Sequence, residues 1–265
     1  MTLARDGWAA LRRFTPARVG LGRSGVSLPT ARQLQLEEAL ALARDAVHER
    51  FAADALAAEL RALSVETVQC RSAAPDRATY LRRPDLGRRL SPESRAKLQS
   101  RGSTPVDLAL IVADGLSAAA SRLHAAPLVG ALLDLLPHKS WKVGPVVLVE
   151  QGRVAVGDEV AELLTARSVL VLIGERPGLS AADSLGAYLT WAPRVGCHDA
   201  SRNCISNIRA EGLTVPEAAR ALAALLASAR NNQLSGVALS QLLASGLGSG
   251  ARSPLDAGQR APKVS

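Results

Sequence analysis

The feature that most constrains this chain is a run of apolar residues from Val169 to Ile173 that breaks at Gly174. No polar residue alternates within the run, so both faces of the strand would be covered, as in a parallel sheet flanked by helices. In open parallel sheets, ligands bind beyond the carboxyl ends of the strands, and the segment 175–178, Glu-Arg-Pro-Gly, would lie there. An ordinary turn is the alternative, because Pro and Gly are common in turns.

Strands and helices alternate after about residue 105. Further apolar runs predict strands at 106–112, 143–150 and 185–191. The repeated strand-helix units predict a right-handed parallel sheet flanked by helices, a Rossmann-like α/β domain, over residues 104–243. We expect residues 1–103 to form a mainly helical region, and the Gly, Ser and Pro content of residues 244–265 predicts a flexible tail.

Capping signals mark two of the predicted helices. Thr30 and Gln33 form a capping-box pattern before a helix expected over 30–51, and Thr214 and Glu217 form another before the last clear helix. The apolar stripe expected on the first of these helices consists of Leu36, Ala39, Leu40, Ala43 and Val47. A short strand is expected over 64–70.

Composition excludes several classes of protein. The formal charge of +8 would suit an anionic partner, but the arginines are spread along the chain and only 3% of the residues are aromatic. A nucleic-acid-binding protein is therefore not expected. No apolar run approaches the roughly 18 residues of a membrane span, so we expect a cytoplasmic protein. The three cysteines include no CxxC pair, which argues against a disulfide framework and against a zinc site.

The catalytic motifs that a chain of this class could carry are missing or out of context. Residues 20–25 match GxGxxG, but no apolar strand precedes them and Pro29 follows where a binding helix should run. Cys197, His198 and Cys204 invite a metal hypothesis, but no closed set of four ligands accompanies them. The residues alone predict a nucleotide-type α/β domain with loops at one end of the sheet, at 113–117, 151–158, 174–180 and 192–207. They predict no reaction.

The arginine-rich segment 71–90 has two interpretations. Its arginines could pair with Asp76 and Asp85 at the surface, or they could form a surface that docks a partner, because arginine is favoured at interfaces.

Seven segments, in order, resemble the small (light) subunit of ethanolamine ammonia-lyase over residues 15–240. They are TPARVGLGRSGVSLPT, DRATYLRRPDLGRRL, VADGLS, GRVAVGDEVAELL, VLIGERPGLS, SLGAYLTWAPR and RNCISNIR. The resemblance implies an adenosylcobalamin-dependent lyase that converts ethanolamine to acetaldehyde and ammonia. It also implies a large subunit that holds the substrate, while the small subunit completes the cobalamin site. A stand-alone nucleotide-dependent enzyme and a basic binding protein are the competing classes.

The resemblance places cobalamin contacts on three residues. They are the valine of GRV, Val154, the acid of GERPG, Glu175, and the thiol of NCISN, Cys204. We expect Val154 to contact the corrin edge, Glu175 to accept hydrogen bonds from cofactor amides or hydroxyls, and Cys204 to pack against the cofactor. No DxHxxG motif occurs, so no residue is expected to replace the cofactor's own base on cobalt, and no catalytic or metal-binding residue is assigned to this chain.

Two further expectations concern assembly and location. Docking on the large subunit would use the arginine-rich segment and the glycine loop at 20–25, so alanine at Arg82, Arg83 and Arg88 together should weaken association. Some members of the family carry a long N-terminal extension linked to packaging in bacterial microcompartments, whereas the match here begins within the first twenty residues. Encapsulation thus stays open.

Overall fold

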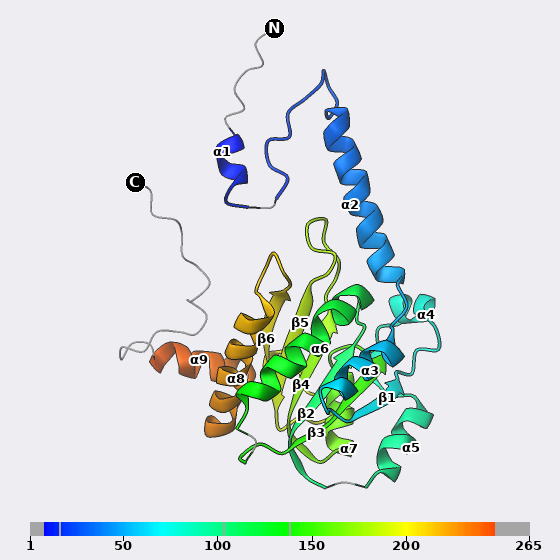
Figure 1. The fold of residues 1–265 in the computed structure, drawn as a ribbon, viewed down its shortest axis with the longest axis vertical. Coiled ribbons are helices and arrows are strands. Elements are labelled where there is room, and N and C mark those ends of the chain that lie inside the picture. The colour runs from blue at the N-terminus through cyan, green and yellow to red at the C-terminus, as the bar shows by residue number, and fades with distance from the viewer. Residues whose placement is uncertain (1–7, 16, 103, 138, 247–265) are drawn as a thin grey trace.

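The computed structural model describes residues 8–15, 17–102, 104–137 and 139–246, and their strands form one six-stranded sheet. The strand order is β1-β3-β2-β4-β5-β6 (Figure 1). The strands are β1 (Thr67–Arg71), β2 (Val106–Ala113), β3 (Val143–Glu150), β4 (Ala166–Gly174), β5 (Leu185–Trp191) and β6 (Arg202–Ile208). The four strands expected from apolar runs after residue 105 are confirmed, and so is the short one before it.

The sheet is mixed, so the prediction of a parallel sheet is correct only in part. Strands β1, β3, β2 and β4 are parallel to one another, whereas β5 is antiparallel to both β4 and β6. The physical reason is the length of the connections. A parallel return needs a crossover of about a dozen residues or more, usually a helix. Residues 175–184 connect β4 to β5 without one, and only a 3-10 turn (Asp199–Ser201) interrupts the connection to β6. The mixed α/β class is confirmed, and the Rossmann-like description stays a prediction.

Helices cover the two faces of this sheet to different extents. One face, called here the α6 face, is covered by four helices, and the other, the α7 face, by two. The helices on the α6 face are α3 (Ala53–Ala62), α6 (Ala118–Leu135), α8 (Val215–Asn232) and α9 (Gly236–Gly246); those on the α7 face are α5 (Pro92–Ser100) and α7 (Val156–Leu163).

The core consists of two apolar layers, one on each face. In β4, Leu170 and Leu172 pack under the α6 face and Val169 and Val171 under the α7 face, all at most 1% exposed. The covered faces expected for this strand are therefore confirmed. Each such leucine contributes about 1.5–3 kcal/mol relative to an exposed one.

The N-terminal region contributes little to this core. Helix α2 (Thr30–His48) projects away from the sheet, and α1 (Ala9–Arg12) also lies apart from the sheet (Figure 1). The capping box expected at Thr30 is wrong, because Thr30 already lies inside the helix. The residue at the N-cap is Pro29, and its side chain makes no capping hydrogen bond. Leu40 of the expected stripe is 52% exposed. The box at Thr214 and Glu217 is confirmed at the start of α8.

The predicted division of the chain near residue 103 remains a prediction. Strand β1 belongs to the first part of that division, yet it pairs with β3, so both parts contribute to one sheet. Of the predicted tail 244–265, residues 247–265 lie outside the described residues, and residues 244–246 end helix α9.

Candidate functional site

Val154 lies in the loop 151–155, which leaves β3 at its carboxyl end and leads into α7. The arginine-rich segment braces this loop from the side. The hydroxyl of Tyr80 in α4 (Arg77–Arg82) donates to the Gly152 carbonyl at 3.0 Å, and Arg153 N donates to the Gly87 carbonyl at 2.7 Å. The Arg153 guanidinium also lies 4.4 Å from the centre of the Tyr80 ring. The loop that carries Val154 is thus fixed by a segment more than sixty residues earlier in the chain.

A buried ion pair supports the same loop from the end of β2. Asp114 Oδ1 accepts from Gly152 N at 3.2 Å, and Asp114 Oδ2 pairs with Arg77 Nη1 at 3.1 Å. Burial raises the pKa of Asp114 to about 7, although the Arg77 charge and two backbone hydrogen bonds oppose the shift. Part of the arginine-rich segment therefore has a structural role, because the Arg77 side chain binds Asp114 at the carboxyl edge of the sheet.

Glu175 is the first residue after β4, and two neighbours fix its carboxylate. Ser184 Oγ donates to Glu175 Oε2 at 2.5 Å, and Asn207 N donates to the same oxygen at 3.2 Å. No described residue donates a hydrogen bond to Oε1. One carboxylate oxygen is therefore held by the protein, and the other is available to a ligand.

The position of this carboxylate depends on a glycine in β5. A Cβ atom at Gly186 would lie 2.8 Å from Glu175 Oε1 and 3.0 Å from a ring carbon of Tyr188. Any larger residue at position 186 would therefore displace Glu175 or Tyr188. Gly186 thus lets the carboxylate lie over the strand beside the aromatic ring.

Cys204 lies in the middle of β6, paired with Tyr188 of β5. The expected loop at 192–207 is wrong for its last six residues, which belong to this strand. Tyr188 and Cys204 lie directly opposite each other in the two strands, and burial raises the pKa of both groups above their ordinary values. Cys204 is nevertheless exposed, because no described helix covers β6 at this position on the α7 face.

An uncovered patch of sheet joins these residues. Helix α7 packs over β2 and β4, and on the α7 face no described helix covers Cys204 or Ser206, which are exposed. Tyr188 is half-buried beside them, and Val154 packs against the same apolar cluster as Tyr188. We call the surface made by Glu175, Tyr188 and Cys204 the open patch; Val154 lies on the same face of the sheet, and Gly186 is buried beside Glu175.

The structure thus places Glu175 and Cys204 on either side of Tyr188. Sequence reasoning missed Tyr188, Gly186 and the two donors to Glu175. The signal available for Tyr188 was its place in SLGAYLTW, where it alternates with residues that face the core.

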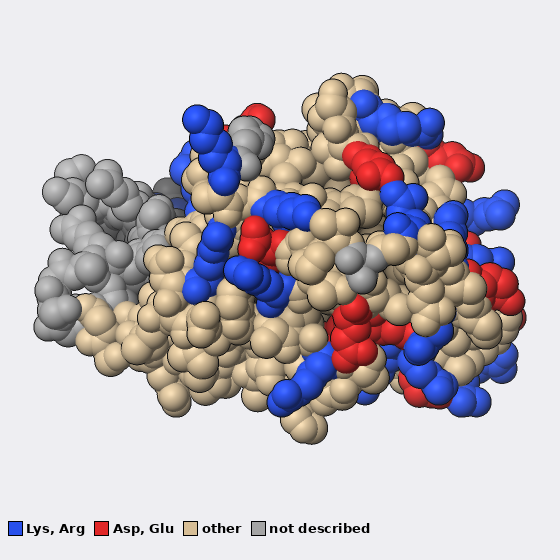
Figure 2. All heavy atoms as spheres, turned by 90° about the horizontal axis from the view of Figure 1, so that it is seen from below, with Lys and Arg blue, Asp and Glu red and all other residues tan. Residues whose placement is uncertain are grey.

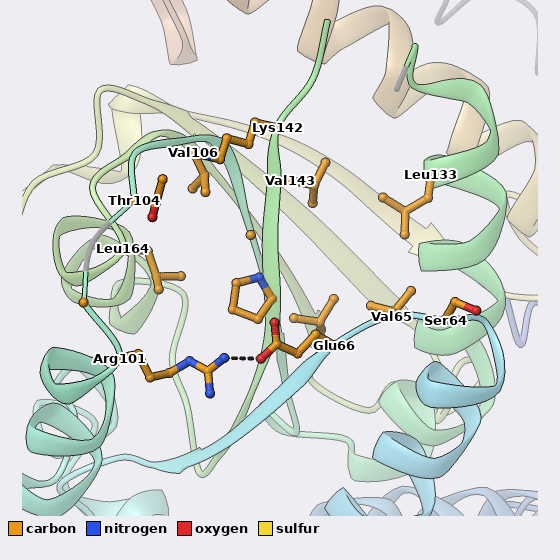
Figure 3. Close-up of a pocket in the computed structure, with 14 residues that line it drawn as sticks. Ser64, Val65, Glu66, Arg101, Thr104, Val106, Leu133, Lys142, Val143 and Leu164 are labelled. Atoms are coloured by element: carbon orange, nitrogen blue, oxygen red, sulfur yellow. Dashed lines mark hydrogen bonds and ion pairs between the residues drawn. The ribbon is translucent and has the colours of Figure 1, made fainter. Parts of the chain in front are cut away.

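A different hollow lies at the opposite edge of the sheet, near the amino ends of β2 and β3. It has a volume of about 370 Å³, and Arg101 and Glu66 form an ion pair across its mouth (Figure 3). Its walls include Val106, Val143 and Leu164. None of the residues of the open patch lines it.

Charge gives no sign of a nucleic-acid surface on the side facing away from α2. There, basic and acidic side chains are interspersed among uncharged ones (Figure 2). Within the part of the chain that the structure describes, no three His, Cys, Asp or Glu side chains are grouped so as to hold a metal ion. No described helix has the length and apolar character needed to span a membrane.

Comparison with known proteins gives one consistent result. Residues 5–240 match the family model for the ethanolamine ammonia-lyase light chain. The ethanolamine ammonia-lyase small subunit of Xanthomonas campestris pv. campestris is 56% identical over 90% of this chain and 89% of the relative. The small subunits of Azotobacter vinelandii and Pseudomonas aeruginosa are 55% and 52% identical, over 88% and 89% of this chain and 87% and 88% of each relative. The chain therefore belongs to the ethanolamine ammonia-lyase small-subunit (light-chain) family.

Proposed function

We propose that this chain is the subunit that completes the adenosylcobalamin site of an ethanolamine ammonia-lyase, with Val154, Glu175 and Cys204 as cofactor contacts. The assembled enzyme would convert ethanolamine to acetaldehyde and ammonia. The observation that carries the proposal is the open patch, where a carboxylate oxygen, an aromatic ring and a thiol lie together on uncovered sheet.

The chemistry of the open patch fits a broad, flat cofactor with amide groups at its rim. A sheet without a covering helix offers a wide surface. Gly186 has no side chain that would project from this surface beside Glu175. Glu175 Oε1 can accept from an amide or hydroxyl, and such charge-assisted hydrogen bonds are stronger than neutral ones. Val154 offers an apolar contact from the neighbouring loop, and Cys204 a packing contact.

Three residues that the sequence did not single out lie against these contacts. Ser184 and Asn207 hold Glu175 in one orientation, and Tyr188 lies opposite Cys204 in the neighbouring strand. Adenosylcobalamin would supply the radical chemistry, while the protein contributes orientation and the exclusion of water and of side reactions.

The shallowness of the open patch supports a requirement for a second subunit. Small-molecule sites usually bury most of the ligand's surface, whereas the open patch has only one wall. The large subunit would supply the opposite wall and hold ethanolamine, and this chain would act only in that complex.

The deciding experiment is Glu175→Gln in the enzyme assembled with its large subunit. We expect cobalamin affinity to fall about tenfold or more, as read from the corrin absorption spectrum, because the neutral amide loses a charge-assisted bond. Glu59→Gln on the exposed side of α3 is the matched control and should leave affinity unchanged. Unaltered affinity and turnover for Glu175→Gln would refute the role given to Glu175.

The arginine-rich segment stays a predicted docking surface. Arg82, Arg83 and Arg88 are exposed, although Arg83 is paired with Asp85 at 2.9 and 2.8 Å. We expect the triple alanine variant to associate more weakly with the large subunit, because arginine is enriched at interfaces. Unchanged co-purification would count against this surface.

A further inference from the structure

Residues 17–48, called here the N-terminal arm, form a loop followed by helix α2, which buries only a narrow stripe of small and half-buried side chains against the rest of the described protein. Only Ala39 and Ala46 are buried in α2. A helix of this length is normally stabilised by packing one apolar face against a core. In the isolated chain this packing is limited to a stripe in which Leu36, Ala43 and Val47 are only half-buried.

Other apolar side chains of the arm are exposed. Val26 is 100% exposed, and Leu34, Leu40 and Leu42 are between 52% and 59% exposed. At about 100° per residue these three leucines point to three different sides of α2. A helix that is apolar on several sides is typical of one enclosed by other protein.

The arm is nevertheless held in place at both ends. At the base of α2, Arg77 Nε donates to the Val47 carbonyl at 2.7 Å, and Arg122 Nε donates to Glu49 Oε1 at 2.9 Å. Near its start, Arg18 Nη2 donates to the Leu179 carbonyl at 3.1 Å. A surface fixed before binding loses less conformational entropy when a partner arrives.

The arm also continues toward the open patch. Gln35, Ala39 and Leu42 line a groove of about 470 Å³ whose other wall is the loop 178–183. That loop belongs to the connection that begins with Glu175. A partner that covers α2 along this wall would reach the carboxylate side of the open patch as well.

The positive charge of the first part of the arm indicates which side chains a partner surface would present. Residues 17–36 of the arm contain Arg18, Arg23 and Arg32 and no acidic residue, whereas the rest of α2 contains Glu37, Glu38 and Asp45 against Arg44. A surface complementary to the loop and the first turns of α2 would therefore combine apolar hollows with carboxylates at their rim.

We infer that the N-terminal arm is a principal docking element of this chain and that the large subunit of the lyase encloses α2. The identity of the partner rests on the proposed function. Family membership as a small subunit, the basic loop and the groove that continues toward Glu175 all favour this occupant over a second copy of the chain or a membrane surface.

The test compares two triple variants in sedimentation with the purified large subunit. In the arm variant, Leu34, Leu40 and Leu42 become serine; in the control variant, Leu63, Leu135 and Leu242 become serine. The control leucines are 43–49% exposed and belong to the ends of α3 and α6 and to α9. We expect association of the arm variant to be at least about 30-fold weaker, because a few apolar anchors carry most of an interface's affinity. The control should remain within about threefold of the unmodified chain.

A charge variant provides a second measurement that does not depend on apolar substitutions. Arg23→Glu with Arg32→Glu should weaken association about tenfold at low salt and less at high salt, because exposed charges are screened. The thermal unfolding of both arm variants should match that of the unmodified chain, since the substituted side chains are outside the core.

Assembly and cofactor binding fail separately in this design. If Glu175→Gln leaves cobalamin affinity unchanged while the arm variant fails to assemble, the cofactor role is wrong and the docking inference stands. Association of the arm variant equal to that of the unmodified chain would overturn the inference. So would arm-dependent dimerisation of the isolated chain, or arm-dependent binding to anionic lipid vesicles, with assembly unaffected.

Discussion

The two faces of the sheet are covered to different extents, and strand β5 shows the difference within two residues. Leu189 faces α6 and α8 and is 0% exposed, whereas its neighbour Tyr188 points to the α7 face and is only half-buried. On the α6 face, helices lie over the sheet from β1 to β6. On the α7 face the cover over β4 does not extend to Cys204 of β6.

The comparison teaches where this fold leaves room for a ligand. Adding the antiparallel strand β5 and then β6 to a parallel sheet extends the α6 layer, because α8 and α9 follow β6. It adds no helix to the α7 layer, because neither β4 nor β5 is followed by a crossover helix. The open patch is thus a consequence of topology, and the candidate residues lie on it.

The largest effect is expected at the boundary between covered and open sheet. There Arg202 forms a bidentate pair with Asp158 of α7 at 2.7 and 2.6 Å, with side chains 3% and 1% exposed. Arg202→Met should lower the free energy of unfolding by about 3–5 kcal/mol, because Asp158 remains buried without a partner. Urea denaturation measures this loss.

The control for the Arg202→Met variant is a double variant in which both charges of the pair are removed. Arg202→Met with Asp158→Leu should recover most of the stability, since apolar replacements of a buried pair are often neutral. Arg83→Ala, which breaks the exposed pair with Asp85, should change stability little. A loss for Arg202→Met no larger than for Arg83→Ala would show that the pair does not hold α7 on the sheet.

The second prediction separates the two faces on one strand. Leu189→Ala should cost about 2–5 kcal/mol of stability by opening a cavity. It should leave cobalamin binding by the folded enzyme unchanged. Tyr188→Ala should cost less stability and should weaken cobalamin binding about tenfold or more in the assembled enzyme. Denaturation curves measure the two losses of stability, and corrin titrations measure the two cofactor affinities. An equal loss of cofactor affinity in both variants would contradict the predicted difference between the two faces.

Much of the covered part of the sheet could be predicted from sequence. Strands β3 and β5 have the predicted bounds, because buried strands appear as apolar runs bounded by turn residues. Strand β6, RNCISNI, could not be found this way. Its Arg202 is buried only because Asp158, 44 residues earlier in the chain, neutralises it, and its Cys204 and Ser206 face open surface.

The candidate site was predictable in its members but not in its arrangement. Resemblance to the family singled out Glu175 and Cys204, yet the ring of Tyr188 between them depends on the register of β5 against β6. The arm shows the opposite error. Helical spacing predicted a buried stripe on α2; Ala39 is buried and Leu36, Ala43 and Val47 are half-buried, but Leu40 is exposed, because no described element lies against that side.

The third prediction concerns pH and the ion pair beneath the Val154 loop. The pKa of Asp114 is raised to about 7, so the folded protein binds this proton more tightly than the unfolded chain does. Stability from this group is full below about pH 4 and is lost as pH rises toward 7, with a slope of at most about 1.4 kcal/mol per pH unit. Asp114→Asn should remove this slope from the pH dependence of urea denaturation. A profile identical to that of the unmodified protein would mean that Asp114 has an ordinary pKa.

The smallest effect is expected at Cys204, on the open side of the comparison. Cys204→Ser should change stability by less than about 1 kcal/mol, because the side chain is exposed and contributes little to the core. Partial burial beside Tyr188 raises the pKa of the Cys204 thiol, so alkylation at pH 7 should be slow.

Alkylation of Cys204 before and after assembly tests whether the open patch becomes covered in the complex. Adding the large subunit and cobalamin should protect Cys204 from alkylation, as followed by mass spectrometry of the modified peptide. Cys197, which is half-buried outside the patch, is the internal reference. Equal alkylation of Cys204 before and after assembly would mean that the α7 face stays open in the complex, and the open patch would then not be a cofactor surface.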